Sequence, residues 1–267
     1  MEEFTHSVAE YLKPYQNLFN YEMMLSAHLD NSRFFPWVQQ LSVYKDPSNC
    51  RILSSGCGSG GDLFVFMESG AKSATGIEVD FRLAKLAKDR FKHSEFQKDF
   101  MISVYNGLNL PLGNNKFDIV FSIHVLEHTK SPKTYLSEIF RVLKKDGILF
   151  LDLPNRYYKI EQHTNIHYLH YLPVRIRNKY IKLLLRKNEL SDDLRYKLST
   201  LINFQIPSAA QILKIVKNYR KEYNLVVEDV FFHSYSLKKT RGSPNPFNYF
   251  IGRPRRQTTF RIVIRKL

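Results

Sequence analysis

The sequence has little cysteine, no long apolar run and comparatively few acidic residues. Cys50 and Cys57 are its only cysteines; they lie too close together for a useful crosslink and fit no metal-ligand spacing. This excludes a disulfide scaffold and a cysteine-rich zinc site, and it favours a reduced, cytoplasmic protein. No apolar stretch approaches the roughly 18 residues of a membrane-spanning helix. The first ten residues are acidic and polar, so we expect no signal peptide.

Acidic residues are outnumbered by basic ones, 25 to 40, which gives a net charge of +15. Such a chain is attracted to nucleic acid, to an anionic membrane face or to phosphorylated substrates. The sequence is rich in Lys, Asn, Ile, Tyr and Phe together. A compositional bias of the source organism would explain the net charge equally well. Two segments hold much of the excess, "RIRNKYIKLLLRK" in the middle and "RRQTTFRIVIRKL" at the C-terminus.

The C-terminal segment reads as a strand. Its alternation separates one face (Phe260, Ile262, Ile264) from another (Arg261, Val263, Arg265). Two interpretations remain open: this segment holds phosphates, or it is an edge strand with a wet basic face.

The order of elements predicts an α/β fold. Residues 7–45 show helical spacing that Pro14 and Pro36 interrupt. From Arg51 onward, short strand-like runs alternate with helical runs up to "ILFLDLP". Strands that alternate with helices pair in parallel, with helices on both faces of the sheet.

This alternation breaks after residue 155. Residues 156–206 are too many for a simple connection and are mostly helical, so we expect an inserted lobe over the active site. The predicted division is an N-terminal helical cap (1–46), a core (47–155 and 207–267) and this lobe (156–206).

The stretch "RILSSGCGSGGD" carries the strongest local signal. Gly56, Gly58 and Gly61 satisfy G-x-G-x-x-G between a strand and a helix, and Glu78 lies 20 residues after Gly58. Glycine lets the backbone approach a ligand closely, and the carboxylate can accept from ribose hydroxyls. Taken alone, this pattern fits a nicotinamide dinucleotide or another adenine nucleoside.

Four ordered motifs, "ILSSGCGSGGD", "GIEVD", "NGLNLPLGNNKFDIVFSIHVLEHT" and "EIFRVLKKDGILFLDLPN", resemble the class I S-adenosylmethionine-dependent methyltransferases. The subgroup that they resemble includes quinone-biosynthesis and other small-molecule methyltransferases. The resemblance covers about residues 48–155 and, more loosely, 207–232. It implies a doubly wound, mostly parallel, seven-stranded Rossmann-like sheet with an antiparallel last strand. The implied cofactor is S-adenosyl-L-methionine, with S-adenosyl-L-homocysteine as product.

The resemblance also implies roles for individual residues. Gly56, Gly58 and Gly60 would bring the backbone against the methionine and ribose. The remaining implied cofactor contacts are Glu78 (ribose hydroxyls), Val79 (adenine), Asn106 (adenine amino group, where the family usually has Asp), Gly107 (backbone beside the ring), and Ser122 and His124 (sulfonium and methionine amine).

Ser54 departs from the family, which usually has an acid there, near the methionine amino group. Two interpretations are open. Either Ser54 bonds the amine directly or through water with some loss of affinity, or the site has decayed.

The segment "HVLEH" matches H-x-x-E-H, a zinc-protease pattern, through His124, Glu127 and His128. Its position after a core strand is wrong for that class. Because an acid–acid–His group binds a divalent ion there in some quinone-pathway relatives, a metal site is an alternative, but we expect no metal.

The stretch "PNRYYKIEQHTNIHYLHYLP" loosely resembles a segment of methyltransferases from bacterial surface-polysaccharide gene clusters. The resemblance implies that it roofs the active site. An alcohol acceptor needs a base, and histidine suits that role near neutral pH. The candidate catalytic residues are therefore His163 and His128.

The sequence thus predicts an enzyme that methylates a small molecule or saccharide, with O-methylation in surface-polysaccharide synthesis as the first choice. The acceptor would be a soluble or lipid-linked molecule, and the enzyme cytoplasmic or at the inner face of the membrane. The alternatives are a nucleic-acid methyltransferase that exploits the basic surface, and a non-catalytic scaffold. No oligomeric state follows from the sequence.

Overall fold

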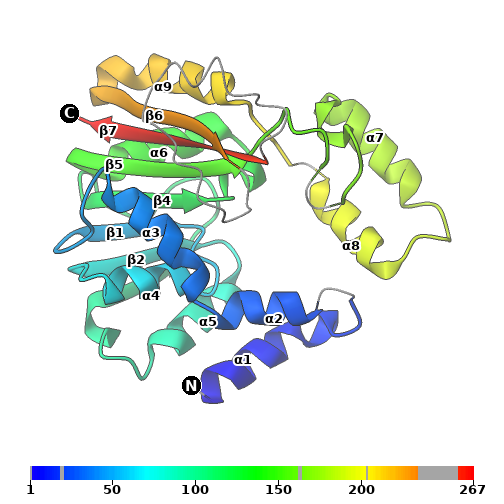
Figure 1. Ribbon diagram of the computed structural model, residues 1–267, viewed down its shortest axis with the longest axis horizontal. Helices are drawn as coiled ribbons and strands as arrows, with labels where there is room; N and C mark the ends of the chain where they lie inside the picture. The colour runs from blue at the N-terminus through cyan, green and yellow to red at the C-terminus, as the bar shows by residue number, and fades with distance from the viewer. Residues whose placement is uncertain (1, 19–20, 162–163, 203, 234–257) are drawn as a thin grey trace.

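The structure is a computed structural model that describes residues 2–18, 21–161, 164–202, 204–233 and 258–267. Its helices are α1 (Glu2–Leu12), α2 (Tyr21–Leu29), α3 (Phe35–Ser42), α4 (Gly61–Glu68), α5 (Phe81–Phe91), α6 (Pro132–Val142), α7 (Val174–Leu184), α8 (Asp192–Leu201) and α9 (Ala209–Tyr223) (Figure 1). Its strands are β1 (Arg51–Ser55), β2 (Ser73–Glu78), β3 (Phe100–Val104), β4 (Phe117–Ile123), β5 (Leu143–Pro154), β6 (Leu225–His233) and β7 (Thr259–Lys266).

These strands form one seven-stranded sheet in the order β3-β2-β1-β4-β5-β7-β6. β1 pairs in parallel with β2 and β4, and β7 pairs antiparallel with both β5 and β6. The predicted fold class, a mostly parallel Rossmann-like sheet with an antiparallel last strand, is confirmed.

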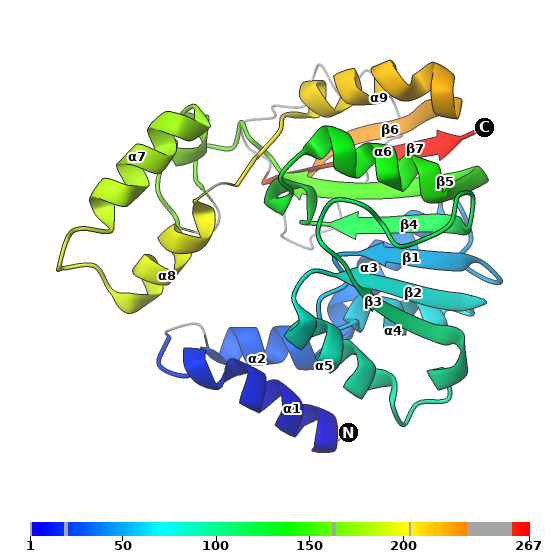
Figure 2. The same cartoon turned by 180° about the vertical axis from the view of Figure 1, so that it is seen from behind.

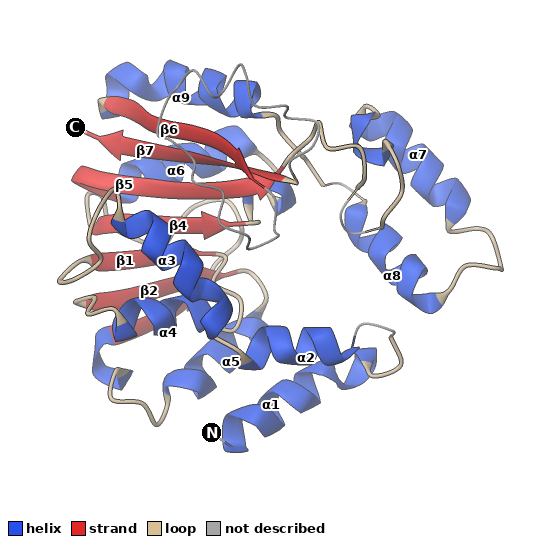
Figure 3. Ribbon diagram, in the orientation of Figure 1, coloured by secondary structure: helices blue, strands red, loops and turns tan. Residues whose placement is uncertain are grey.

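Two apolar cores cover the two faces of the sheet. Ile52 of β1 packs in the core beneath α3, α4 and α5, whereas its neighbour Leu53 packs on the opposite face beneath α6 and α9. Figures 2 and 3 show the two helical layers on either side of the strands. Successive strand residues point to opposite faces, so a strand buried on both sides reads as a continuous apolar run.

The ends of the helices follow local chemistry. Ser131 caps α6 as predicted, because its side chain accepts from the Thr134 amide at 3.2 Å. α1 ends at Leu12, just before Pro14. Pro36 lies in the first turn of α3, where proline is tolerated, instead of interrupting a helix.

The edge-strand interpretation of the C-terminal segment is wrong. β7 lies inside the sheet, between β5 and β6, and Arg261 and Val263 are fully buried. The buried arginine is tolerated because Asp152 of β5 pairs with its Nε at 3.2 Å.

α7 and α8 form a lobe that stands beyond the end of the sheet to which β4 and β5 point (Figure 1). The lobe has its own small core around Leu169, Ile181, Leu198 and Leu201. α3 belongs to the sheet core, so α1 and α2 are the N-terminal helices that remain to form a cap.

Candidate cofactor and active site

The loop after β1 is a backbone cradle at the carboxyl ends of the parallel strands. Gly56, Gly58 and Gly60 have positive φ angles of 72°, 52° and 77°. A Cβ on Gly56 would lie 2.5 Å from a methyl group of Val125, whereas one on Gly58 would meet nothing within 4 Å. The loop therefore needs glycine for its turn and presents bare backbone to open space at Gly58.

Glu78 at the end of β2 is held against this loop. The amide of Gly58 donates to one carboxylate oxygen at 2.9 Å, and those of Val79 and Asp80 donate to the other at 2.7 and 3.1 Å. The residue is only 7% exposed. The oxygen that accepts from Val79 and Asp80 has both lone pairs in use, whereas the oxygen that accepts from Gly58 retains one, so the group is oriented and can still accept from a ligand.

An open apolar surface lies beside Glu78. The side chain of Val79 is 57% exposed, and its Cγ1 lies 3.5 Å from where a Cβ on Gly107 would be. Asn106, which precedes Gly107, accepts with its side-chain oxygen from the amides of Leu108 and Asn109 at 2.9 and 3.2 Å. Both lone pairs of that oxygen are used, so the amide NH₂ is the group left to address a ligand.

Ser54 faces a carboxylate that the sequence analysis missed. Its hydroxyl donates to Asp62, the second residue of α4, and the Leu63 amide donates to the other Asp62 oxygen at 2.8 Å. Both residues are buried. Burial raises the pKa of Asp62 to about 6, against the lowering effect of the Ser54 and Leu63 hydrogen bonds and the charge of Arg33.

The side chain of Ser122 does not lie at the mouth of the site. It is fully buried and shares a 2.7 Å hydrogen bond with the hydroxyl of Tyr135. The Tyr135 hydroxyl donates in turn to Ser55 at 2.7 Å. These three hydroxyls join β1, β4 and α6 directly beneath the site.

A cluster of acids and histidines follows β4. His124 has a φ of 54°, and its ring nitrogens lie 3.4 Å from Glu127 and 3.6 Å from Asp152. Burial lowers the pKa of His124, but the contact with Glu127 and the charges of Glu127 and Asp152 outweigh it, and the pKa ends above its ordinary value. The ring of His124 is therefore engaged by two buried carboxylates.

Glu127 is fully buried, and neither of its oxygens has a well-formed hydrogen bond among the residues that the structure describes. His128 approaches the same oxygen as His124, with Nε2 4.0 Å from Glu127 Oε1. The His128 side chain is 47% exposed and packs edge-on against the ring of Phe204, with centroids 4.2 Å apart. Of these two histidines, His128 is the more exposed, because the side chain of His124 is 24% exposed.

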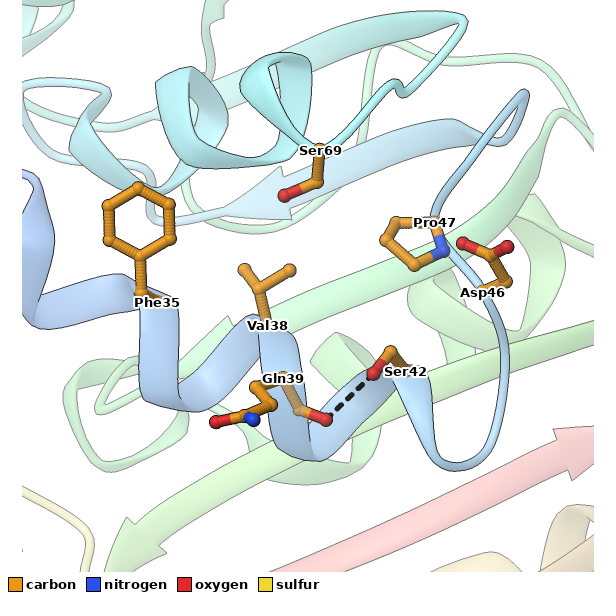
Figure 4. Close-up of a pocket in the computed structure, with 7 residues that line it drawn as sticks. All are labelled: Phe35, Val38, Gln39, Ser42, Asp46, Pro47 and Ser69. Carbon is orange, nitrogen blue, oxygen red and sulfur yellow. Dashed lines mark hydrogen bonds between the residues drawn. The ribbon is translucent and has the colours of Figure 1, made fainter.

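The other candidate base, His163, lies outside the described residues. Within the described part of the chain, no group of three or more His, Cys, Asp or Glu side chains is arranged to hold a metal ion. A shallow hollow beside α3 lies away from this site, near the amino end of β1 (Figure 4). It is lined by Phe35, Val38, Gln39, Ser42, Asp46, Pro47 and Ser69.

Sequence reasoning could have found two of the missed residues. Asp62 follows the glycine loop directly, where an acid complements the start of a helix. Asp152 interrupts the apolar run "ILFLDL", which is unusual in a buried strand. Burial of Glu127 between two histidines has no such signal, because it depends on how the turn after β4 folds.

Comparison with known proteins shows what this site is similar to. Residues 53–151 match the family described as "Methyltransferase domain", and this segment contains the glycine loop, Glu78 and the turn after β4. Residues 53–151 are thus similar to class I S-adenosylmethionine-dependent methyltransferase domains. S-adenosylmethionine is the cofactor of that class, and the bare loop, oriented carboxylate and open apolar surface fit an adenosyl ligand.

Curated relatives of the methyltransferase domain differ in what their names say they act on. The chain is 28% identical over 112 residues to a ubiquinone biosynthesis O-methyltransferase of Pelagibacter ubique, covering 42% of this chain and 45% of that protein. It is 31% identical over 119 residues to a tRNA U34 carboxymethyltransferase of Actinobacillus succinogenes, covering 44% and 36%. The chain thus spans less than half the length of these two relatives.

Solved structures share the fold over most of the chain. An S-adenosylmethionine-dependent methyltransferase from Mesorhizobium loti aligns with a TM-score of 0.57 at 13% identity, covering 88% of this chain and 98% of that one. Geranyl diphosphate C-methyltransferase from Streptomyces coelicolor aligns with a TM-score of 0.55 at 14% identity, covering 96% and 86%. At this identity, the likeness shows the fold alone.

Proposed function

We propose that this protein transfers a methyl group from S-adenosylmethionine to a hydroxyl of a small-molecule or saccharide acceptor. The observation that carries the proposal is the orientation of Glu78, which three backbone amides fix at the glycine loop. In that position the free lone pair of the oxygen bonded to Gly58 accepts from a ribose hydroxyl. Val79 packs on the adenine, and Gly107 leaves room for the ring.

The proposal assigns the remaining cofactor contacts from the same geometry. Asn106 addresses the adenine with its NH₂ group, because its oxygen is already used by two amides. Asp62, aligned by Ser54, supplies the carboxylate for the methionine ammonium group. This accounts for the missing acid at position 54 without a decayed site. Ser122 contributes through its backbone, because its hydroxyl is turned toward Tyr135.

When bound, S-adenosylmethionine supplies an electrophilic methyl group on a sulfonium. The protein then has to align the acceptor oxygen, exclude water and take up the hydroxyl proton. His128 is the proposed base: it reaches solvent, and buried Glu127 stabilises the imidazolium that forms. The O–CH₃ bond forms as the S–CH₃ bond breaks, the proton goes to His128, and S-adenosylhomocysteine leaves.

Calorimetry of cofactor binding tests the site first. S-adenosylmethionine and S-adenosylhomocysteine should bind the wild type in the micromolar range, whereas NAD should not bind. Glu78→Ala should weaken binding by about 10- to 100-fold, because a hydrogen bond to a charged group is lost. Glu68→Ala, on the exposed end of α4, is the matched control and should bind normally. Absence of cofactor binding by the wild type would favour the non-catalytic scaffold.

The acceptor needs a separate assay. A panel of sugars, nucleotide sugars and phenols is screened for release of S-adenosylhomocysteine. With a productive acceptor, His128→Asn should lower kcat by about 10²- to 10⁴-fold while cofactor affinity is retained. An unchanged kcat would remove His128 from the mechanism and leave His163 as the candidate.

An RNA acceptor is the second candidate. The net charge of +15 and the tRNA-modifying relatives favour it. It predicts tRNA binding that weakens steeply with salt and methyl transfer to tRNA in the same assay. We place the small-molecule acceptor first because no recognised RNA-binding module occurs in the sequence.

A further inference from the structure

The outer surface of α7 carries a pattern that the methyltransferase core does not use. One face of the helix is accounted for, because Arg177 and Ile181 are buried inside the lobe. Ile181 packs in the lobe core, and the Arg177 guanidinium donates to the carbonyls of Leu201 and Phe204 near the end of α8. Val174, Asn178 and Leu184 are half-buried, and the remaining side chains of the helix are exposed.

Three large apolar side chains project from that outward surface. Ile176, Tyr180 and Leu183 are 55%, 44% and 58% exposed. They are spaced four and three residues apart, so they form one stripe along the helix. Single exposed apolar residues are ordinary, whereas a contiguous exposed stripe on one helix marks an interaction surface.

A cationic stripe runs beside the apolar one. Arg175, Lys179 and Lys182 of α7 are exposed and recur at helical spacing, and exposed Arg186 follows in the turn after the helix. At 3.6 residues per turn, this stripe lies about 100° around the helix from the apolar stripe. Residues 174–188 contain no acid. None of the four cations forms an ion pair with an acid in the described part of the chain.

The apolar and cationic stripes together indicate which class of partner fits this surface. RNA would use the cations but leave the aliphatic side chains in water, and a neutral protein groove would leave the cations without partners. An anionic bilayer uses both, because apolar residues enter the boundary between headgroups and acyl chains while Lys and Arg meet the phosphates. Tyrosine is also favoured at that depth.

We propose that the outer face of α7 docks this protein on an anionic lipid bilayer. The helix lies in the plane of the interface, with Ile176, Tyr180 and Leu183 inserted and the cationic stripe against lipid phosphates. The lobe stands beyond the end of the sheet to which β4 and β5 point, so docking brings the proposed active site toward the bilayer (Figure 1). The inference does not depend on methyl transfer.

Vesicle flotation of the full chain tests this surface. The wild type should float with vesicles of phosphatidylcholine and phosphatidylglycerol, and only weakly with phosphatidylcholine alone. Lys179→Glu/Lys182→Glu/Arg186→Glu should weaken binding to the mixed vesicles on the order of 100-fold. Ile176→Ser/Tyr180→Ser/Leu183→Ser should weaken it at least about tenfold.

The matched control carries the same change of charge elsewhere. Lys214, Lys217 and Lys221 are exposed on α9, away from the lobe. Their triple substitution by Glu should weaken binding only about two- to threefold, through the net charge alone. Thermal melting and calorimetry with S-adenosylhomocysteine verify that each variant is folded.

Hydrogen exchange of the wild type gives a readout without any variant. Mixed vesicles should slow amide exchange within residues 174–187 and leave α9 unchanged. The proposal is overturned if the wild type does not bind mixed vesicles, or if the α9 variant loses as much binding as the α7 variant. It is also overturned if the apolar stripe proves to be a dimer contact, so that the serine variant becomes monomeric while its vesicle binding is unchanged.

Discussion

At the scale of single residues, the pairing of Ser54 with Asp62 has a consequence for pH. The family that the sequence resembles usually has an acid at position 54 of β1. In this protein the acid is Asp62, eight residues later at the start of α4, where it is buried and accepts from the Ser54 hydroxyl. Burial raises the pKa of Asp62 to about 6. Near neutral pH the carboxylate is ionised and can hold an ammonium group, whereas below about pH 6 it is protonated.

Cofactor affinity should therefore depend on Asp62 and on pH. In the wild type, affinity for S-adenosylmethionine should fall by about tenfold between about pH 7 and pH 5, as Asp62 takes up a proton. Asp62→Asn should bind about tenfold more weakly than the wild type at pH 7 and match it at pH 5. Ser54→Asp/Asp62→Ser, which returns the acid to β1, should recover most of the affinity. Calorimetry across this range measures all three proteins, and a flat profile for the wild type would remove Asp62 from the site.

The raised pKa of Asp62 also makes the stability of the protein depend on pH. In the folded protein the pKa of Asp62 lies above the ordinary value of about 3.9. The protonated side chain therefore contributes to the free energy of unfolding, and this contribution is fully present below about pH 4 and is lost as the pH rises through 6. Asp62→Asn should accordingly be more stable than the wild type at pH 7, by about 2 kcal/mol, and show no gain at pH 4. Urea unfolding at the two pH values separates this effect from the loss of binding.

At the scale of elements, the position of β7 between β5 and β6 depends on a buried charge. The Arg261 guanidinium pairs with Asp152 and lies over the rings of Trp37, Phe150 and Phe231 at 4.5 to 4.8 Å. Asp152 also faces His124 across 3.6 Å, which links this interior strand to the site. Removing one partner of a buried pair leaves the other charge without compensation.

Arg261→Leu should therefore destabilise the protein by about 3–5 kcal/mol, and Arg261→Leu/Asp152→Asn should recover part of that loss. Arg265→Leu is the matched control on the same strand. Arg265 pairs with Glu228 at the sheet surface, where both side chains are about a quarter exposed. Loss of this pair should lower the free energy of unfolding by about 1 kcal/mol or less. Urea unfolding gives the comparison, and equal losses at the two positions would contradict the assigned role of Arg261.

At the scale of the whole molecule, the lobe meets the N-terminal helices as well as the core. The rings of Tyr15, after α1, and Tyr196 on α8 lie 5.3 Å apart. On the core side, the Gln205 amide donates to the Glu127 carbonyl at 2.8 Å, beside His128. We infer from these two contacts that the N-terminal helices and the lobe together enclose the acceptor site.

Loss of the Tyr15–Tyr196 contact should loosen the lobe without unfolding the core. An aromatic pair contributes about 0.5–1.5 kcal/mol, so Tyr196→Ala should speed amide exchange in α8 by about two- to tenfold. Tyr15→Ala should do the same from the other side of the contact. Thr200→Ala, exposed on the same helix, should leave exchange unchanged. Exchange in the sheet should stay as in the wild type, and faster exchange there would mean that the contact supports the core instead.

What the sequence determined by itself was local. The alternation of strands and helices, the glycine loop, the acid that ends β2 and the Ser131 cap each depend on residues close together in the chain. These were enough to predict the α/β fold class, whereas the methyltransferase core was predicted from the resemblance of four ordered motifs to a known family.

What only the tertiary structure decided concerns contacts across the chain. Arg261 and Asp152 are 109 residues apart, and no periodicity within either strand shows that β7 enters the sheet beside β5 instead of lying at its edge. Ser54 and Asp62 meet because the glycine loop folds back, and Glu127 is buried between two histidines because the turn after β4 closes over it. The physical reason is that burial of a charge is set by what packs around it, and that environment is assembled from several distant segments at once.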